Sequence, residues 1–181
     1  MDITNSEFFL LILIRENREI SGYKINVLIE ERGHREWAGI GSTSIYKGLK
    51  KLEINGFVRS GLDIHKTTKG PVGKKYLITA TGQKQLIKEL KSGLSETREH
   101  NPRFKIALSG IDLLENSQTV DLLEKRVSFL NSEYQRLNTK KGLMEHKVFK
   151  VQMMFDHSLE AIKSERKFTT NLIKQYNRNK S

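Results

Sequence analysis

The chain has 181 residues, with 32 Lys or Arg against 21 Asp or Glu and a formal net charge of +11. Its residues are 36% hydrophobic and 29% charged, which allows a core but is polar for a compact enzyme. The absence of cysteine excludes disulfides, a thiolate zinc site and a cysteine nucleophile.

The first predicted element is a helix over about residues 5–17, with Phe9, Leu10 and Leu13 in the core. The apolar run within it, residues 8–14, is seven residues long. That is too short for the core of a signal peptide or for a membrane span, and no basic segment precedes it. We therefore expect a cytoplasmic protein.

A second helix is expected over about residues 22–32, where Ser21 is the N-cap and Ile25 and Ile29 point inward. Tyr23 falls in the first turn of this helix. Its ring can lie beside the free N–H groups of the helix start and bind a phosphate, or it can be wedged between helices. The sequence leaves both positions open.

Trp37 is the only tryptophan and precedes the most informative stretch of the chain. Two roles fit it: an anchor in the core beneath the next helix, or a platform on which a planar ligand stacks. The sequence favours the anchor.

Residues 41–58 predict a short helix that ends at Gly56 and gives way to a β-like segment. At about 100° per residue, Ile45, Leu49 and Leu52 fall within one narrow sector. This sector is the face that we expect to pack against the rest of the domain.

The opposite face of the same helix carries Thr43, Lys47 and Lys50, with Lys51 at its flank. Small hydroxyls near a helix start and lysines along its side suit the major groove of DNA, because lysines attract phosphates and hydroxyls reach base edges. An ordinary solvated helix would also carry lysines, so this face alone does not decide between the two interpretations.

Two β-like runs follow, at residues 57–60 and 75–79, separated by a polar, turn-rich loop at residues 61–73. A helix, a strand, a basic loop and a second strand make the pattern of a winged helix-turn-helix. Residues 42–75 hold eight positive and two negative charges, so this window carries +6 of the total of +11. That concentration favours binding of a polyanion over general solubility.

Thr79 or Thr81 is expected to begin a fourth helix with Leu86, Leu90 and Leu94 on its apolar face. Pro102 then marks a break between the two halves of the chain.

Beyond the break, the sequence predicts two long helices, at about residues 117–140 and 144–176, joined by a bend at Gly142. Their apolar residues follow heptad-like steps of three and four. Antiparallel packing of the two helices would cover part of this stripe, and a second chain would cover the rest. A monomeric hairpin is the alternative. The residues expected at a dimer contact are Leu123, Val127, Leu130, Tyr134, Leu137, Val148, Val151, Phe155, Leu159 and Ile162.

The residues expected at DNA have two roles. Ser42, Thr43 and Lys47 are expected to discriminate bases, whereas the other lysines are expected to bind phosphates. The full set is Ser21, Tyr23, Ser42, Thr43, Ser44, Tyr46, Lys47, Lys50, Lys51, Lys66, Lys69, Lys74 and Lys75.

Four segments occur in an order that is typical of one known family. They are residues 8–13, residues 21–25, Trp37 followed by residues 41–58, and residues 70–82. Through them the chain resembles the PadR-like transcriptional regulators. One departure is Lys47-Gly48, where the family usually has Pro-Ala.

The resemblance implies a mainly α fold with a small β-wing, an α+β winged helix-turn-helix, followed by a long-helix dimerisation domain. We accordingly expect a DNA-binding domain at residues 1–97 and a dimerisation domain at residues 103–181. The resemblance also implies a homodimer that binds double-stranded DNA at an inverted repeat, most simply as a repressor, without a cofactor. Many members of the family respond to a small molecule, and a small apolar ligand would enter between the two domains. No residue here identifies such a ligand.

The patterns of enzymes and metal sites are missing. The five histidines form no His-x-x-x-His pair; His146 and His157 share a helical face without an evident third ligand. Residues 70–75 have two residues between glycines where a phosphate-binding loop has four. The remaining alternative is a winged-helix docking module without sequence-specific DNA binding, which would not need the basic wing.

Overall fold

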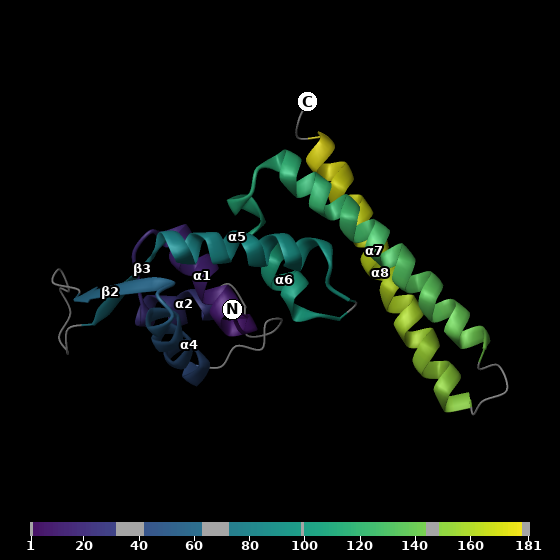
Figure 1. The fold of residues 1–181 in the computed structure, drawn as a ribbon, viewed down its shortest axis with the longest axis horizontal. Coiled ribbons are helices and arrows are strands. Elements are labelled where there is room, and N and C mark those ends of the chain that lie inside the picture. Colours follow the sequence, from purple (N-terminus) through teal and green to yellow (C-terminus); the bar gives the residue numbers. More distant parts are fainter. Residues whose placement is uncertain (1, 32–41, 63–72, 99, 144–148, 179–181) are drawn as a thin grey trace. The chain divides into compact units, whose positions relative to one another are not determined.

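The computed structural model describes residues 2–31, 42–62, 73–98, 100–143 and 149–178, except the side chains of Ser42 and Thr43 (Figure 1). The chain forms two compact units. The first comprises Met1–Leu90 and Lys105–Gly110, and the second comprises Lys91–Phe104 and Ile111–Ser181. The predicted ranges 1–97 and 103–181 differ from these units in two places. Residues 91–97 belong to the second unit instead of the first, and residues 105–110 belong to the first unit instead of the second.

Helix α1, Asn5–Asn17, is the centre of the first unit. It begins with a capping box, in which the Glu7 N–H donates to the Thr4 hydroxyl and the Thr4 N–H donates to the Glu7 carboxylate, both at 3.2 Å. All seven residues from Phe8 to Ile14 are fully buried. The helix is therefore enclosed on all sides, as its continuous apolar run requires. The predicted range of 5–17 is confirmed.

A two-residue strand, β1 at Ile20–Ser21, leads into α2 at Gly22–Glu31. The Lys24 N–H donates to the Ser21 hydroxyl at 3.2 Å, which confirms Ser21 as the N-cap of α2. The strand itself was not predicted, because two residues are too few for an alternating pattern to be recognised.

Helix α4, Ser42–Ile54, ends in a Schellman motif. The Phe57 N–H donates to the Leu52 carbonyl and the Gly56 N–H donates to the Glu53 carbonyl. Gly56 has φ +70°, in the left-handed region that glycine adopts readily because it has no Cβ to clash with the backbone. The predicted stop at this glycine is confirmed.

Strands β2, Val58–Leu62, and β3, Lys74–Ile78, form an antiparallel pair, with β1 on the other side of β3. The register places Arg59 opposite Leu77. The two strands that flank the predicted wing are thereby confirmed to within two residues. The wing loop falls mostly on residues 63–72, which lie outside the described residues, as do its lysines, Lys66 and Lys69. Trp37 also lies outside them.

Helix α5 spans Ala80–Ser95, and Thr79 is the N-cap residue that precedes it. The Gly82 N–H donates to the Thr79 hydroxyl at 3.0 Å, and this hydroxyl donates in turn to the Gly56 carbonyl at 2.7 Å. The predicted start at Thr79 is confirmed. The cap also ties the beginning of α5 to the turn that follows α4.

The rest of the described chain is helical. Helix α6, Pro102–Ser109, has its first three residues in the second unit and the others in the first. It begins at the proline that the sequence marks as a break, since proline is well suited to the first position of a helix. A short 3₁₀ helix, η1 at Ile111–Leu113, follows. The two long helices are α7, Asn116–Gly142, and α8, Phe149–Arg178. No helix among the described residues is long and apolar enough to cross a membrane.

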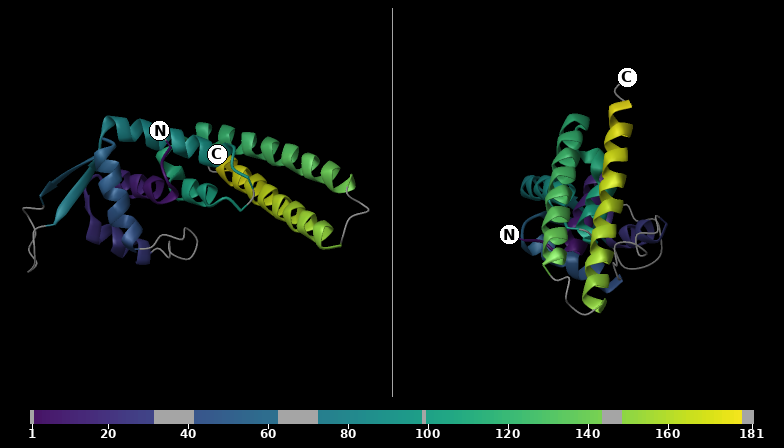
Figure 2. Two further views of the ribbon diagram at one scale, coloured as in Figure 1. Left: turned by 60° about the horizontal axis from the view of Figure 1, so that its bottom comes forward. Right: turned by 90° about the vertical axis from the view of Figure 1, so that its right-hand side faces the viewer.

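Helices α7 and α8 lie side by side and antiparallel (Figures 1 and 2). Their core contains Leu130, Leu137, Leu159 and Ile162, against which Phe129, Tyr134 and Phe155 pack. Most of the heptad-like seam is thus buried within one chain, which confirms the antiparallel packing of the two helices. Val148 lies outside the described residues.

Candidate nucleic-acid interface

Helix α4 has the two faces that the sequence predicts. Ile45, Leu49 and Leu52 are fully buried in the first unit. The opposite face exposes Lys47 and Lys50 to solvent. A helix that is anchored on one side and basic on the other can insert its basic side into a groove without losing its own support.

Two glycines bring neighbouring helices close to α4. A Cβ at Gly48 would lie 2.7 Å from Cδ1 of Leu10 in α1, and a Cβ at Gly22 would lie 3.0 Å from Cε1 of Tyr46. The ring of Tyr46 therefore lies against the first residue of α2. Tyr46 is 57% exposed, so only part of it is covered and it remains accessible to a ligand.

Serine and threonine residues form the start of α4. Ser42 and Thr43 are its first two residues, but their side chains lie outside the described residues. Ser44 is half-buried. The first turn of the helix holds no acidic residue, so no side chain of that turn neutralises the partial positive charge of the N-terminus.

Three of the predicted phosphate ligands already bind a carboxylate of the same chain. Lys51 Nζ lies 3.0 Å from the buried carboxylate of Glu7, an ion pair that connects α4 to α1. Lys74 Nζ lies 3.6 Å from Glu53, and Lys75 Nζ lies 3.7 Å from Glu19. The sequence did not reveal these pairs, since two of the three carboxylates come from distant parts of the chain.

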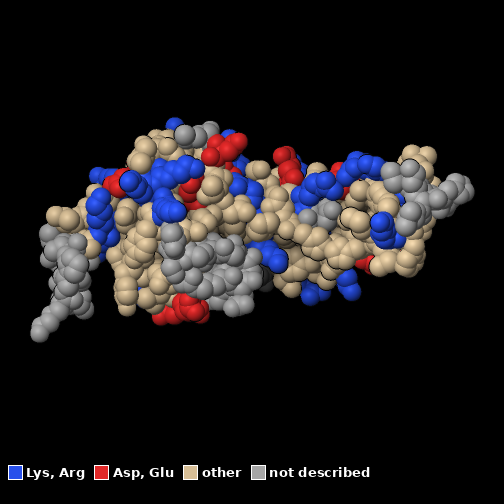
Figure 3. All heavy atoms as spheres, turned by 90° about the horizontal axis from the view of Figure 1, so that it is seen from below, with Lys and Arg blue, Asp and Glu red and all other residues tan. Residues whose placement is uncertain are grey.

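Lys47 and Lys50 differ from that group. Within the described part of the chain, neither ammonium has an ion-pair or hydrogen-bond partner. Figure 3 shows one face of the molecule, on which Lys and Arg side chains gather over the first unit with a few carboxylates among them. Among the described residues, Lys47 and Lys50 are therefore the lysines of α4 whose charge no carboxylate compensates.

Arg59 is a further basic residue that the predicted set omitted. It is exposed on β2, next to the buried Val58, and has no partner among the described residues. The alternation of buried Val58 and exposed Arg59 is the signal that could have identified it.

The tyrosines of this region differ in their surroundings. Tyr23 is 73% exposed, so the alternative in which its ring is wedged between helices is wrong. Tyr76 is half-buried on β3, and its burial, followed by the charge of Glu53 and the proximity of Tyr46, raises the pKa of its phenol.

The described residues contain no cluster of three or more metal-binding side chains. His157 stacks on His100, with ring centroids 5.5 Å apart, whereas His146 lies outside the described residues. The helical face that His146 and His157 were predicted to share is thus described only at His157.

The described elements make the pattern of a winged helix-turn-helix. Helices α2 and α4 precede the hairpin of β2 and β3, which belongs to a three-stranded sheet, and α4 exposes a basic face. Residues 10–88 match the model of the transcriptional regulator PadR-like family. Over these residues the chain is similar to the PadR-like family, which is described as a family of transcriptional regulators.

Several solved structures are similar over most of their length. PadR of Bacillus subtilis in complex with operator DNA is 22% identical, with 94% of this chain and 98% of that chain covered and a TM-score of 0.44. The PadR-like regulator BC1756 of Bacillus cereus is 15% identical, covers 97% of both chains and has a TM-score of 0.42. The B. subtilis PadR complex with p-coumaric acid is 20% identical, with coverages of 96% and 99% and a TM-score of 0.42. The comparison with curated proteins gave no match.

Proposed function

We propose that this protein is a sequence-specific DNA-binding regulator of transcription, a repressor that binds an inverted-repeat operator as a homodimer. The observation that carries the proposal is the exposed face of α4, where Lys47 and Lys50 have no carboxylate partner among the described residues. The family of residues 10–88 supports the same function. DNA binding also agrees with the cytoplasmic location predicted from the sequence.

The residues of the interface have different expected contributions. Lys50 and Arg59 have no carboxylate partner among the described residues and would bind phosphates, while Lys47 and the first residues of α4 would reach base edges. Lys51, Lys74 and Lys75 must exchange or share a carboxylate partner before they bind a phosphate. We therefore expect these three to contribute less than their charge suggests.

A homodimer would use surface that the α7–α8 hairpin leaves uncovered. Phe149, Met153 and Met154 are more than half exposed at the beginning of α8. A second copy of the chain would bury them and set two winged helices on one duplex, at half-sites about 34 Å apart. The predicted contact residues Leu130, Leu137, Leu159 and Ile162 pack within the hairpin, where they would hold together the two helices that form this contact.

Selection of fragmented genomic DNA by the purified protein, at about physiological salt and followed by sequencing, tests the proposal directly. We expect enrichment of an inverted repeat upstream of genes. Uniform recovery of fragments would contradict sequence-specific binding, and no recovery would favour the docking module. Release of the enriched DNA by small aromatic or apolar compounds would then test for an effector.

Replacement of Lys47 and replacement of Lys50 by alanine are expected to have different effects on DNA binding. Lys50→Ala should weaken binding to all sequences alike and reduce the slope of log K against log salt by about 1 for each chain bound. Lys47→Ala should also change the preferred bases. Equilibrium binding to the selected repeat and to its single-base variants measures both effects.

The matched control for these variants is Lys84→Ala. Lys84 is an exposed lysine of α5 in the same unit, without a partner among the described residues, and its removal changes the net charge equally. An equal loss of affinity in Lys84→Ala and Lys50→Ala would show that only the total charge matters and would contradict the assignment of α4 to the groove.

A further inference from the structure

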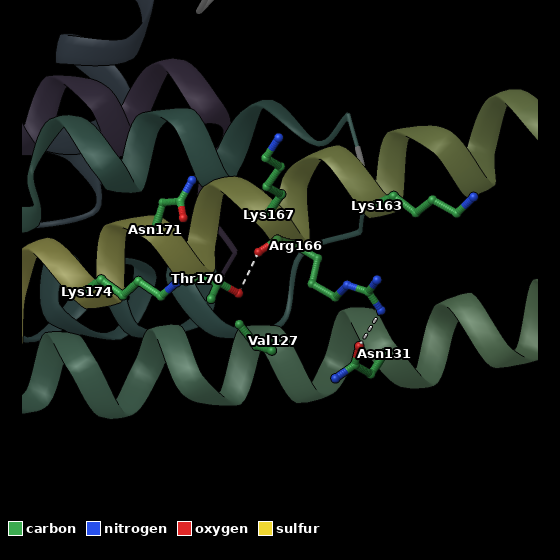
Figure 4. A pocket seen from close by; sticks show the side chains of 8 residues that line it. All are labelled: Val127, Asn131, Lys163, Arg166, Lys167, Thr170, Asn171 and Lys174. Atoms are coloured by element: carbon green, nitrogen blue, oxygen red, sulfur yellow. Dashed lines mark hydrogen bonds between the residues drawn. The ribbon is translucent and has the colours of Figure 1, made fainter.

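A groove of about 630 Å³ runs along the α7–α8 hairpin, and none of the residues that line it is in the set predicted to contact DNA. Its walls come from the side chains of both helices (Figure 4). The volume is in the range of sites that hold small molecules, roughly 300–1,000 Å³. None of the described side chains that line it is acidic.

The groove is strongly basic. Four cationic side chains of α8 line it: Lys163, Arg166, Lys167 and Lys174. Residues spaced by three, four and seven lie on neighbouring lines of one helix face, so these charges form a row. Lys167 and Lys174 are seven residues apart, which is about 10 Å along the helix axis.

Little of this charge is neutralised by the protein. Lys163 Nζ lies 2.7 Å from the carboxylate of Glu160. Arg166 instead donates to the side-chain oxygen of Asn131 at 2.9 Å, across from α8 to α7, and this amide is neutral (Figure 4). Lys167 and Lys174 have no partner among the described residues. Three cations that have no carboxylate partner among the described residues therefore line one hollow.

A second hollow on α7 shows that this is not a general property of the hairpin. It is lined by Asp121, Glu124, Lys125 and Ser128, where both signs of charge occur together. Two hollows of the same helical unit thus differ in electrostatic character. The basic one also offers uncharged contacts, namely the amides of Asn131 and Asn171, the hydroxyl of Thr170 and the apolar surface of Val127.

We propose that the groove between α7 and α8 binds a small molecule that carries several phosphate groups, such as a nucleoside triphosphate or an inorganic polyphosphate. Lysine is a point-charge ligand for phosphate, and a row of such charges favours several linked phosphates over a single one. Arg166, already oriented by Asn131, adds a planar fork of donors. The inference does not depend on the proposed DNA binding.

Isothermal titration of the full chain with adenosine triphosphate and with inorganic tripolyphosphate, both without divalent cations, tests this site. We expect saturable binding of at least one probe, and binding of inorganic phosphate that is weaker by about tenfold or more, because fewer charge-assisted bonds form. Binding of tripolyphosphate alone would identify a polyphosphate site, and stronger binding of the nucleotide would identify a nucleotide site.

The variant Lys167→Ala/Lys174→Ala should lose affinity for the bound probe by about tenfold or more, since two charge-assisted contacts are removed. Its matched control is Lys125→Ala/Lys150→Ala, which removes two exposed lysines of the same unit outside the groove. Circular dichroism establishes that both variants are folded.

Three results would overturn the proposal. The first is the absence of saturable binding to every probe by the unaltered chain. The second is an equal loss of affinity in both double variants, which would indicate an effect of net charge. The third is loss of DNA affinity in the groove variant without any binding of the small probes, which would make the groove a contact for the DNA backbone.

Discussion

Replacement of Gly82 by alanine is expected to lower the free energy of unfolding of the first unit by about 3 kcal/mol, at the upper end of typical overpacking costs. A Cβ at this position would lie 2.0 Å from the Phe57 carbonyl oxygen and 2.8 Å from its carbon. These are backbone atoms, so the clash cannot be relieved by rotating a side chain. The better helix propensity of alanine offsets at most about 1 kcal/mol.

The neighbouring hydrogen bonds make this contact difficult to relax. The Thr79 N–H donates to the same Phe57 carbonyl at 3.0 Å, and the Thr79 hydroxyl receives the Gly82 N–H. Any shift of α5 that makes room for a methyl group therefore breaks the cap of α5 as well. Urea unfolding followed by circular dichroism measures the loss.

Gly61→Ala is the control for this prediction. A Cβ at Gly61, on β2, meets nothing within 4 Å, and we expect a change within about 0.5 kcal/mol. Equal stability of Gly82→Ala and the unaltered protein would show that the start of α5 does not approach the turn after α4 as closely as the structure has it.

Replacement of Arg126 by methionine is expected to destabilise the second unit by about 3 kcal/mol, because one partner of a buried ion pair is removed. The guanidinium is fully buried. It donates to the Thr97 carbonyl at 2.8 Å, to the Thr97 hydroxyl at 2.6 Å and to the Glu165 carboxylate at 2.5 Å. Its central carbon also lies 3.6 Å from the centroid of the Phe104 ring.

The environment of this arginine has opposing effects on its ionisation. Burial lowers the pKa of the Arg126 guanidinium, and the charge and hydrogen bond of Glu165 raise it. Loss of the guanidinium leaves the carbonyl and hydroxyl of Thr97 without this donor, which adds to the cost of the unpaired carboxylate. Thermal unfolding of the full chain, followed at the helical signal, measures the change.

Arg136→Met serves as the comparison for this second prediction. Arg136 also binds a carboxylate, at 2.7 Å from Glu133, but its side chain is 48% exposed. Exposed ion pairs contribute about 0.5 kcal/mol or less, so the two arginines should differ severalfold in effect. Similar losses in both variants would contradict the buried role of Arg126.

The sequence predicted those parts of the fold that depend on neighbours along the chain. The apolar run of α1, the face of α4 with Ile45 and Leu49, and the cap at Ser21 are local patterns, and each is confirmed. The stop of α4 at Gly56 is local as well. Such features are readable because spacing and capping chemistry act within one or two turns.

The features that could not be predicted depend on residues far apart in the sequence. Nothing near Lys51 indicates that its partner is Glu7 on α1. Arg126 stands in a polar stretch, where an arginine is expected to be exposed, and only the return of α8 with Glu165 buries it. Helix α6 was missed because its eight residues are too few to establish a period.

The burial of the heptad-like seam inside one hairpin has a consequence for how the protein responds to dilution. Leu130, Leu137, Leu159 and Ile162 find their partners within the same chain. An obligate dimer loses its fold as its concentration falls, whereas a hairpin whose core lies within one chain needs no second copy to fold. We therefore expect the helical unit to stay folded when the protein is diluted. The proposed homodimer would then form from two chains that are already folded.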